Sequence, residues 1–347
     1  MRARVTGMGA AVPAAYSQQA VWEGFFDRHY RDVRIAEQIF ANSGVGTRHA
    51  VANPVFEDVS GWGTGARMER YLAEALPLGK DAVAAALADA GKDPADVGLF
   101  AVVSCTGYVT PGLDIRLARD LGMSDLVQRL FVGHMGCYAA LPGLGAVADF
   151  TAARDRSAVL LCLELTSLHI QPPTDEVDQV VAHALFADAA SALVLEPGDA
   201  RPGFEVVDVV AQTDVGTAEH MTWDVTDLGF RMGLSPRVPA VLARHVRGVV
   251  DRLLGAHGLD RHDVDGWAVH PGGRRILEVV QRRLELEPSA LDASYGVLRD
   301  YGNCSSPTVL LVLDRLRAAG AVRPGRYAVA MAFGPGLTLY AALLRRS

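Results

Sequence analysis

The chain has 347 residues, half of them hydrophobic, and a formal net charge of −7. This length and composition allow a large buried core and exclude a disordered or fibrous protein. An acidic balance without a long basic run argues against nucleic acid as a partner, and no segment is long and apolar enough to suggest a membrane span. We therefore expect a soluble, cytoplasmic enzyme.

Apolar runs of strand length recur along the chain. Several are apolar on both faces, which is typical of buried strands in a layered α/β protein. Helical periodicity predicts helices at Lys80–Ala90 and Val309–Ala319, each followed by a glycine that suits a left-handed C-cap. The predicted strands are Ala3–Met8, Leu99–Ser104, Ala158–Leu165, Ser191–Leu195, Phe204–Val210, Gly266–His270, Tyr327–Phe333 and Leu337–Leu344.

The segment Glu196–Gly203 contains two prolines and two glycines and predicts a connector between two halves, residues 1–203 and 204–347. Both halves alternate strands with helices, so the fold class is α/β. No phosphate-binding loop occurs, and the short Gly-x-Gly fragments lack the spacing of a dinucleotide fingerprint. A nucleotide cofactor is therefore not indicated.

Four scattered cysteines contain no CxxC pair, which indicates neither a zinc site nor a disulfide framework. Cys137 lies between a glycine and a run of small and apolar residues. If it opens a helix, free backbone N–H groups and the helix dipole favour its thiolate, the form that acts as a nucleophile. The alternative is a small buried hydrophobic side chain.

Two further residues strengthen the first interpretation. His270 ends an apolar strand and precedes a turn and a helix, a position where catalytic groups are common. Asn303 lies in a turn before another apolar helix, where its simplest role is an N-cap or Asx-turn. Together, the imidazole and the amide form the donor pair that thioester chemistry needs for an enolate or oxyanion.

At this point the chain resembles the type III polyketide synthases, the chalcone-synthase-like branch of the thiolase superfamily, over nearly its whole length. Six motifs occur in the family's order. They are GCYAALPGL around Cys137, LELTSL at Leu163–Leu168, ALFADAASAL at Ala184–Leu193, HPGGRRIL at His270–Leu277, YGNCSSP at Tyr301–Pro307 and FGPGLT at Phe333–Thr338.

The resemblance implies a duplicated, five-layered α-β-α-β-α thiolase-like fold, with the nucleophile in residues 1–203 and the other two catalytic residues in 204–347. Cys137 would be acylated by a starter acyl-CoA. His270 and Asn303 would promote decarboxylation of malonyl-CoA and stabilise the enolate, and cyclisation and release would follow. The resemblance implies no metal and no organic cofactor.

Other residues are carried over by position. Phe186 matches one of two gatekeeping phenylalanines between the CoA tunnel and the cavity, whereas Met232 occupies the second gate position. Core packing is the alternative role for the residues at cavity positions. The full set of substrate-binding candidates is Cys105, Thr166, His169, Phe186, Trp223, Met232, Gly272, Arg275, Ser305 and Pro335.

Bulky side chains at His169 and Trp223 predict a small cavity and hence a short product or a small starter. The resemblance also implies a homodimer in which Thr110, beside Pro111-Gly112, lies near the neighbouring active site. A further departure is Ala332, which stands where the family usually has glycine.

The basic residues that hold the CoA phosphates in plant members are not matched, because the chain has Ile35, Gln38 and Asn42 there. Arg274 and Arg275, or Arg34, are candidate substitutes. Delivery of the acyl group by an acyl carrier protein is the alternative route.

Competing functions are a ketoacyl-carrier-protein synthase III-like enzyme and an inactive acyl-CoA-binding scaffold. Pro271-Gly272-Gly273 and Pro335 favour the polyketide synthase over the first, and an intact catalytic set argues against the second. A thiolase lacks support because no cysteine lies in the C-terminal closing segment. A hydrolase lacks support because no Gly-x-Ser-x-Gly elbow occurs.

Overall fold

In a computed structural model, which describes residues 2–198 and 201–347, the chain forms one nine-stranded sheet built from two similar halves. The first half runs inward from its free edge as β5 (Gln128–Val132), β4 (Leu99–Val103), β6 (Ala158–Glu164), β7 (Ala189–Pro197) and β1 (Ala3–Ala11). The second half continues as β8 (Phe204–Thr213), β13 (Thr338–Arg346), β12 (Tyr327–Gly334) and β11 (Val264–Val269).

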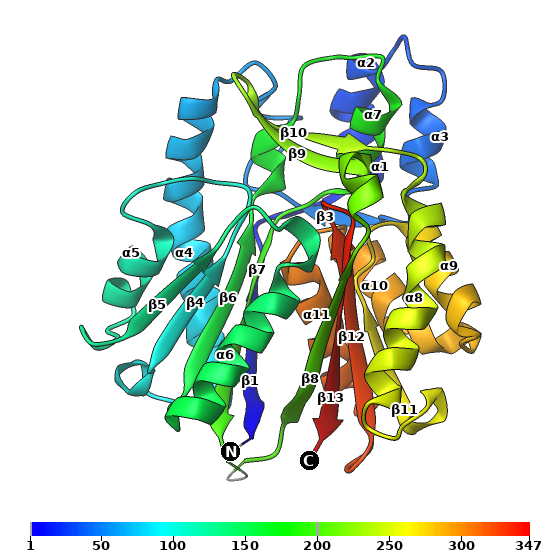
Figure 1. The fold of residues 1–347 in the computed structure, drawn as a ribbon. Helices are drawn as coiled ribbons and strands as arrows, with labels where there is room; N and C mark the ends of the chain where they lie inside the picture. The colour runs from blue at the N-terminus through cyan, green and yellow to red at the C-terminus, as the bar shows by residue number, and fades with distance from the viewer. Residues whose placement is uncertain (1, 199–200) are drawn as a thin grey trace.

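The two halves have the same strand pattern. In each, two neighbouring strands are parallel (β4 with β6, β11 with β12), and the next two pairings toward the middle are antiparallel. Within the described part of the sheet, strands of the two halves pair at two residue pairs between β1 and β8, near the chain ends at the lower edge of Figure 1. The predicted connector spans this junction, although its residues 199 and 200 lie outside the described part of the chain.

Helices lie between the halves of the sheet and on both outer faces. They are α1 (Gln18–Val21), α2 (Asp27–His29), α3 (Ala36–Ala41), α4 (Thr64–Ala90), α5 (Leu113–Asp120), α6 (Ala140–Arg154), α7 (Val177–Leu185), α8 (Val238–Gly255), α9 (Arg274–Leu284), α10 (Asp292–Tyr301) and α11 (Pro307–Ala318). Two small antiparallel sheets complete the fold, β2 (Ala15–Ser17) with β3 (Thr47–His49) and the hairpin of β9 (Met221–Thr226) with β10 (Gly229–Leu234). No described helix is both long and apolar enough to cross a bilayer.

The three large hydrophobic cores of the described chain lie between five layers. The central core packs α6 and α11 between the halves of the sheet, whereas α4 covers the outer face of the first half and α8 and α9 cover that of the second. Alternate strand residues enter different cores, as Leu160 and Leu161 do, because side chains alternate across a strand. The predicted α/β, thiolase-like layering is therefore present.

Helix α4 begins at Thr64, well before its predicted start at Lys80, and continues through Pro77. Its contact with β1 is so close that a Cβ on Gly7 would lie 2.4 Å from the carbonyl oxygen of Ala86. A Cβ on Gly9 would also clash with the backbone of this helix. Packing of the buried helix face therefore outweighs the hydrogen bond that proline removes.

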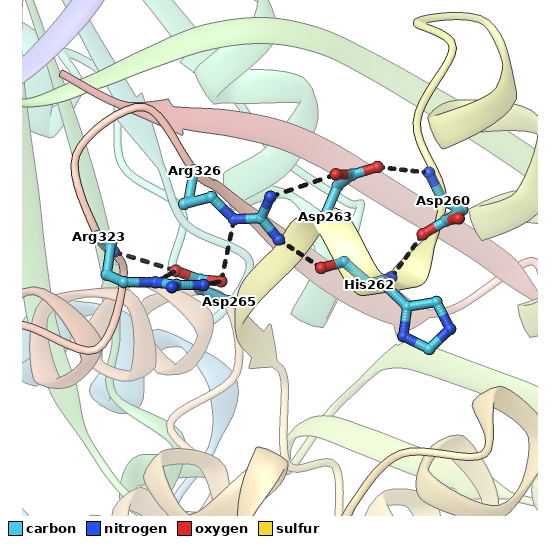
Figure 2. A network of polar contacts seen from close by, with 6 residues as sticks. All are labelled: Asp260, His262, Asp263, Asp265, Arg323 and Arg326. Carbon is cyan, nitrogen blue, oxygen red and sulfur yellow. Dashed lines mark hydrogen bonds and ion pairs between the residues drawn. The ribbon is translucent and has the colours of Figure 1, made fainter.

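A surface network fixes the starts of β11 and β12 (Figure 2). Arg323 donates two hydrogen bonds to Asp265, of 2.7 and 2.8 Å, and Arg326 bridges Asp265 and Asp263. These guanidinium groups hold the pKa of Asp265 far below its usual range. The network sets the alignment of two parallel strands whose other ends carry His270 and the turn after Gly334.

Candidate active site

Cys137 lies in a 3₁₀ turn, Gly136–Tyr138, that leads into α6. Gly136 has a φ of +70°, and a Cβ there would lie 2.8 Å from Cδ of Pro335. A Cβ on Gly334 would lie 3.3 Å from the backbone nitrogen of Cys137. The turn after β12 therefore packs directly on the backbone of the nucleophile candidate, and both glycines are needed for this approach.

The thiol of Cys137 is buried, and burial raises its pKa to about 12. Hydrogen bonds with the side chains of Ser305 and Asn303 oppose this shift only in part. The backbone N–H at this turn lowers the pKa of the thiol, in the direction that the sequence argument expected, but burial outweighs it. Desolvation penalises the charged sulfur more than the short turn stabilises it.

Asn303 is held by its backbone and by one end of its amide. Its N–H donates to the carbonyl of Leu185 over 2.9 Å, and its own carbonyl accepts from Ala187 over 3.0 Å, which places it beside Phe186. Oδ1 accepts a hydrogen bond from the backbone of Ser305 over 2.9 Å. Because Oδ1 is occupied, the Nδ2 donor is the end of the amide available to the thiol and to a substrate.

His270 directly follows β11 and is fully buried. Its backbone N–H binds the carbonyl of Met331 over 2.8 Å, and its ring contacts Phe333 edge-on. Neither ring nitrogen has a hydrogen-bond partner among the described residues. Burial lowers the pKa of the imidazole to about 3, so the ring is neutral, with one donor and one acceptor unused.

Glu164, at the end of β6, joins two loops beside Cys137. It accepts hydrogen bonds from the backbone of Cys105 (3.0 Å), from Oγ1 of Thr106 (2.7 Å) and from Oγ of Ser306 (2.8 Å). Burial raises its pKa, and these hydrogen bonds work against the shift. Glu164 thus fixes the loop after β4 against the loop that carries Asn303.

A small cavity of about 40 Å³ lies beside the gate position Phe186, a volume on the order of three water molecules. The ring of His169 stacks on Phe230 at 4.6 Å and meets Trp223 edge-on at 5.5 Å. These rings form part of the cavity wall, which does not include Cys137, His270 or Asn303. Five of the predicted substrate-binding residues line this cavity, namely Thr166, His169, Phe186, Trp223 and Met232.

The remaining candidates divide into two groups. Cys105 and Ser305 lie beside Cys137. Ser305 makes a hydrogen bond with the thiol of Cys137, and the charge of Cys137 contributes to the raised pKa of Cys105. Gly272 lies beside the ring of His270, and Pro335 lies on Gly136. By contrast, Arg275 is exposed on the first turn of α9, away from the buried thiol.

Sequence reasoning missed Glu164 and Phe230 as parts of this region. Glu164 lies within the quoted motif LELTSL, and a single acid at the end of a fully apolar strand was the signal that marked it. Phe230 had no such signal, because its position depends on the β9–β10 hairpin. The described residues contain no group of three His, Cys, Asp or Glu side chains arranged to bind a metal ion.

Comparison with known proteins agrees with this geometry. The profile "Chalcone and stilbene synthases, N-terminal domain" matches residues 2–199, and the corresponding C-terminal profile matches residues 206–347. The chain is 35% identical to a 3,5-dihydroxyphenylacetyl-CoA synthase of Streptomyces toyocaensis, over 99% of this chain and 90% of that protein. It is 36% identical to a 1,3,6,8-tetrahydroxynaphthalene synthase of Streptomyces peucetius subsp. caesius, over 90% and 84%.

The crystal structure of PKS-I from the brown alga Ectocarpus siliculosus has the same fold, with a TM-score of 0.93 and 31% identity over 100% of this chain and 98% of that one. The chain therefore belongs to the chalcone and stilbene synthase family. It is a type III polyketide synthase, an acyltransferase that condenses malonyl units.

Proposed function

We propose that Cys137 is the nucleophile and that His270 and Asn303 form its donor pair. Cys137 attacks the carbonyl carbon of a starter acyl-CoA, its proton passes to His270, and CoA leaves as the thiol. Malonyl-CoA then binds with its thioester oxygen toward His270 and Asn303. Loss of CO₂ leaves an enolate, whose carbon attacks the Cys137 thioester and expels the Cys137 thiolate, so that the extended chain remains on CoA.

The free polar atoms of the site support these roles. Both ring nitrogens of His270 are buried and find no partner in the described part of the chain, which costs stability unless a ligand uses them. The raised pKa of Cys137 favours a neutral thiol at rest, so that the thiolate forms only as the proton moves to an acceptor. Asn303 keeps its Nδ2 donor directed away from its own turn.

The product is proposed to be short and built on a small starter. The single observation that carries this is the cavity of about 40 Å³ whose wall includes the His169, Trp223 and Phe230 rings. Two relatives carry the names of small polyhydroxylated aromatic products. We place the product of this enzyme in the same size class.

A homodimer is proposed because β5 has an unpaired edge with exposed apolar side chains. Among the described strands it pairs only with β4, at the edge of the sheet (Figure 1). Leu130 and Phe131 on it are exposed, as are Leu126, Tyr108 and Ile115. Exposed apolar edge strands are usually covered in native proteins. A second copy of this chain, placed with its β5 against this β5 around a two-fold axis, would cover the exposed edge.

The experiment that tests the function is mass spectrometry of products after incubation with malonyl-CoA alone and with a panel of acyl-CoAs. Cys137→Ala is the control, because it removes only the sulfur from a buried site. Short products from small starters, absent in the control, support the proposal. Product formation by folded Cys137→Ala would overturn the assignment of the nucleophile.

A further inference from the structure

We propose that Asp188 is a positioning residue, which holds the turn of Asn303 in place against the cavity wall. This inference deepens the proposed function and rests on the role given there to Asn303. Asp188 is fully buried and directly follows the segment that pairs with Asn303. Burying a carboxylate is costly unless its oxygens are well hydrogen-bonded, so the groups that it binds indicate what it does.

The carboxylate of Asp188 joins two segments of the cavity wall. Oδ1 accepts a hydrogen bond from the backbone N–H of Ser167 over 2.8 Å, and Oδ2 accepts from Oγ of Ser167 over 2.5 Å. Oδ2 also accepts from the backbone N–H of Val51 over 2.9 Å. Ser167 lines the cavity, and so do Ala50 and Ala52 on either side of Val51. One side chain therefore fixes the segment after β3 against the turn after β6.

The backbone around Asp188 leads directly to Asn303. The N–H of Ala187 donates to the carbonyl of Asn303 over 3.0 Å. The N–H of Asp188 donates to the carbonyl of His49 over 2.9 Å. Oγ1 of Thr166 lies 2.9 Å from the carbonyl oxygen of Ala187 and 3.2 Å from Oδ1 of Asp188, so its one proton is used at this junction in either case. A shift of the Asp188 side chain therefore moves a residue that is bonded to Asn303.

Charge alone does not account for Asp188. The buried guanidinium of Arg48 is close enough for the charge of Asp188 to raise its pKa, against the larger effect of burial. Within the described chain, however, the terminal nitrogens of Arg48 donate to backbone carbonyls and to Gln18 rather than to Asp188. A buried carboxylate adds little net stability, because its interactions mainly offset the cost of desolvation. What it adds is geometry, since its neutral donors come from two separate segments.

A further contact relates Asp188 to the same turn. Cys304, the residue after Asn303, is fully buried, and the charge of Asp188 adds to the effect of burial in raising the pKa of its thiol. Glu164 binds this turn from another direction, through Oγ of Ser306. Asn303 thus lies between two buried acids, with Glu164 fixing the residues after it and Asp188 fixing the segment beside it.

Asp188→Asn removes the carboxylate with almost no change in size. An amide has one oxygen in place of two, so its NH2 group meets the N–H of Ser167 or that of Val51 and leaves this donor without an acceptor. The segment that carries this N–H must then move, and the Asn303 turn shifts relative to the cavity wall. Because small misplacements cost large factors in rate, we expect decarboxylation of malonyl-CoA to slow by roughly 10- to 100-fold, with KM nearly unchanged.

Two partial reactions separate positioning from a general loss of structure. Release of CO₂ from labelled malonyl-CoA measures the step that uses Asn303, and intact-protein mass spectrometry after mixing with an acyl-CoA measures acylation of Cys137. We expect Asp188→Asn to slow the first and to leave the second within about twofold of wild type. Val250→Ala, which opens a cavity in the core beneath α8, is the control for lost stability and should change neither rate.

A double-mutant cycle tests whether Asp188 acts through Asn303. If it does, Asp188→Asn adds little to the loss that Asn303→Ala already causes, because the amide that it positions is gone. Effects that multiply, or an equal loss in both partial reactions, would overturn the inference. Should Asp188→Asn fail to fold, Ser167→Ala removes one donor from the carboxylate and allows the same comparison in a milder variant.

The positioning role and the proposed function fail in different ways. A slow Asn303→Ala beside a folded Asp188→Asn that releases CO₂ at the wild-type rate overturns the positioning role alone. Release of CO₂ at the wild-type rate by Asn303→Ala itself overturns the proposed function of Asn303, and the positioning role with it.

Discussion

Trp223 donates a hydrogen bond from its indole Nε1 to the backbone carbonyl oxygen of Cys105, over 2.8 Å. The next carbonyl, that of Thr106, is 2.7 Å from Nε2 of His169. The other ring nitrogen of His169 accepts from the backbone of Phe230 over 3.0 Å, so Nε2 carries the proton and donates. Two cavity residues thus tie the β9–β10 hairpin to the loop beside Cys137, and the cavity wall is fixed at both ends.

His169 should make the protein sensitive to acid. Burial lowers its pKa to about 4, from about 6.5 in the unfolded chain, so the unfolded state binds a proton more readily. Stability from this residue is complete above pH 6.5 and is lost as the pH falls toward 4. Between pH 7 and pH 5, wild type should lose about 2 kcal/mol more unfolding free energy than His169→Gln.

Urea titrations of both proteins at the two pH values, at one protein concentration, measure this difference. Glutamine can accept from Phe230 and donate to Thr106 without titrating, so other acid-sensitive groups, such as His270, affect both proteins alike. Equal losses in the two proteins would show that His169 is not held neutral by burial.

Asn303 should be required for decarboxylation of malonyl-CoA. Removing one donor from such a site typically lowers the rate by about 100- to 1,000-fold, and Asn303→Ala is expected to fall in this range. Release of CO₂ from labelled malonyl-CoA measures the step directly. Asn303→Asp keeps an oxygen for the backbone N–H of Ser305 but lacks the amide donor. If Asn303→Asp recovered the wild-type rate, Asn303 would be a turn residue and nothing more.

The free edge of β5 should hold the homodimer together. Phe131 is 44% exposed on this edge, and Phe131→Glu places a charge where the second copy is proposed to pack. We expect light scattering to show a dimer for wild type at micromolar concentration and a shift toward monomer for this variant. Phe56, which is 81% exposed in the loop between β3 and α4, provides a matched Phe→Glu control that should remain dimeric. A monomeric wild type would contradict the proposal.

The sequence predicted the buried strands well, because a run that is apolar on both faces has few alternatives to a covered strand. It missed β5 and the β9–β10 hairpin, whose residues are largely exposed or half-exposed, so that their stability depends on neighbours far along the chain. It also began α4 too late, at Lys80. The first half of α4 is held by tertiary contacts without a local signal, such as the hydrogen bonds of Arg67 with the carbonyls of Leu168 and Ile170 and that of Tyr71 with Ser104.

For the site, the structure brings the side chains of Ser305 and Asn303 into hydrogen-bond contact with the thiol of Cys137, while the catalytic role of each residue stays a prediction. The charge state of the thiol was not predictable, since desolvation depends on everything packed around Cys137. The role of Glu164 was hidden for the same reason. Its hydrogen-bond donors come from two loops about 60 and 140 residues away along the chain, and only the folded structure brings them together.

Trp223 should limit the size of the product. Its ring lines the cavity of about 40 Å³, so Trp223→Gly opens space in a packed site that can accept apolar groups. We expect this variant to form a longer product or to accept a longer acyl-CoA starter, as measured by mass spectrometry across the acyl-CoA panel.

The opposing effect is loss of the hydrogen bond to Cys105, which loosens the loop beside the nucleophile. Trp223→Phe separates the two effects, because it loses this bond but keeps most of the ring. If volume decides, Trp223→Phe retains the wild-type product and only Trp223→Gly changes it. The same change in both variants would assign the effect to the hydrogen bond, and an unchanged product in a folded, active Trp223→Gly would show that Trp223 does not limit chain length.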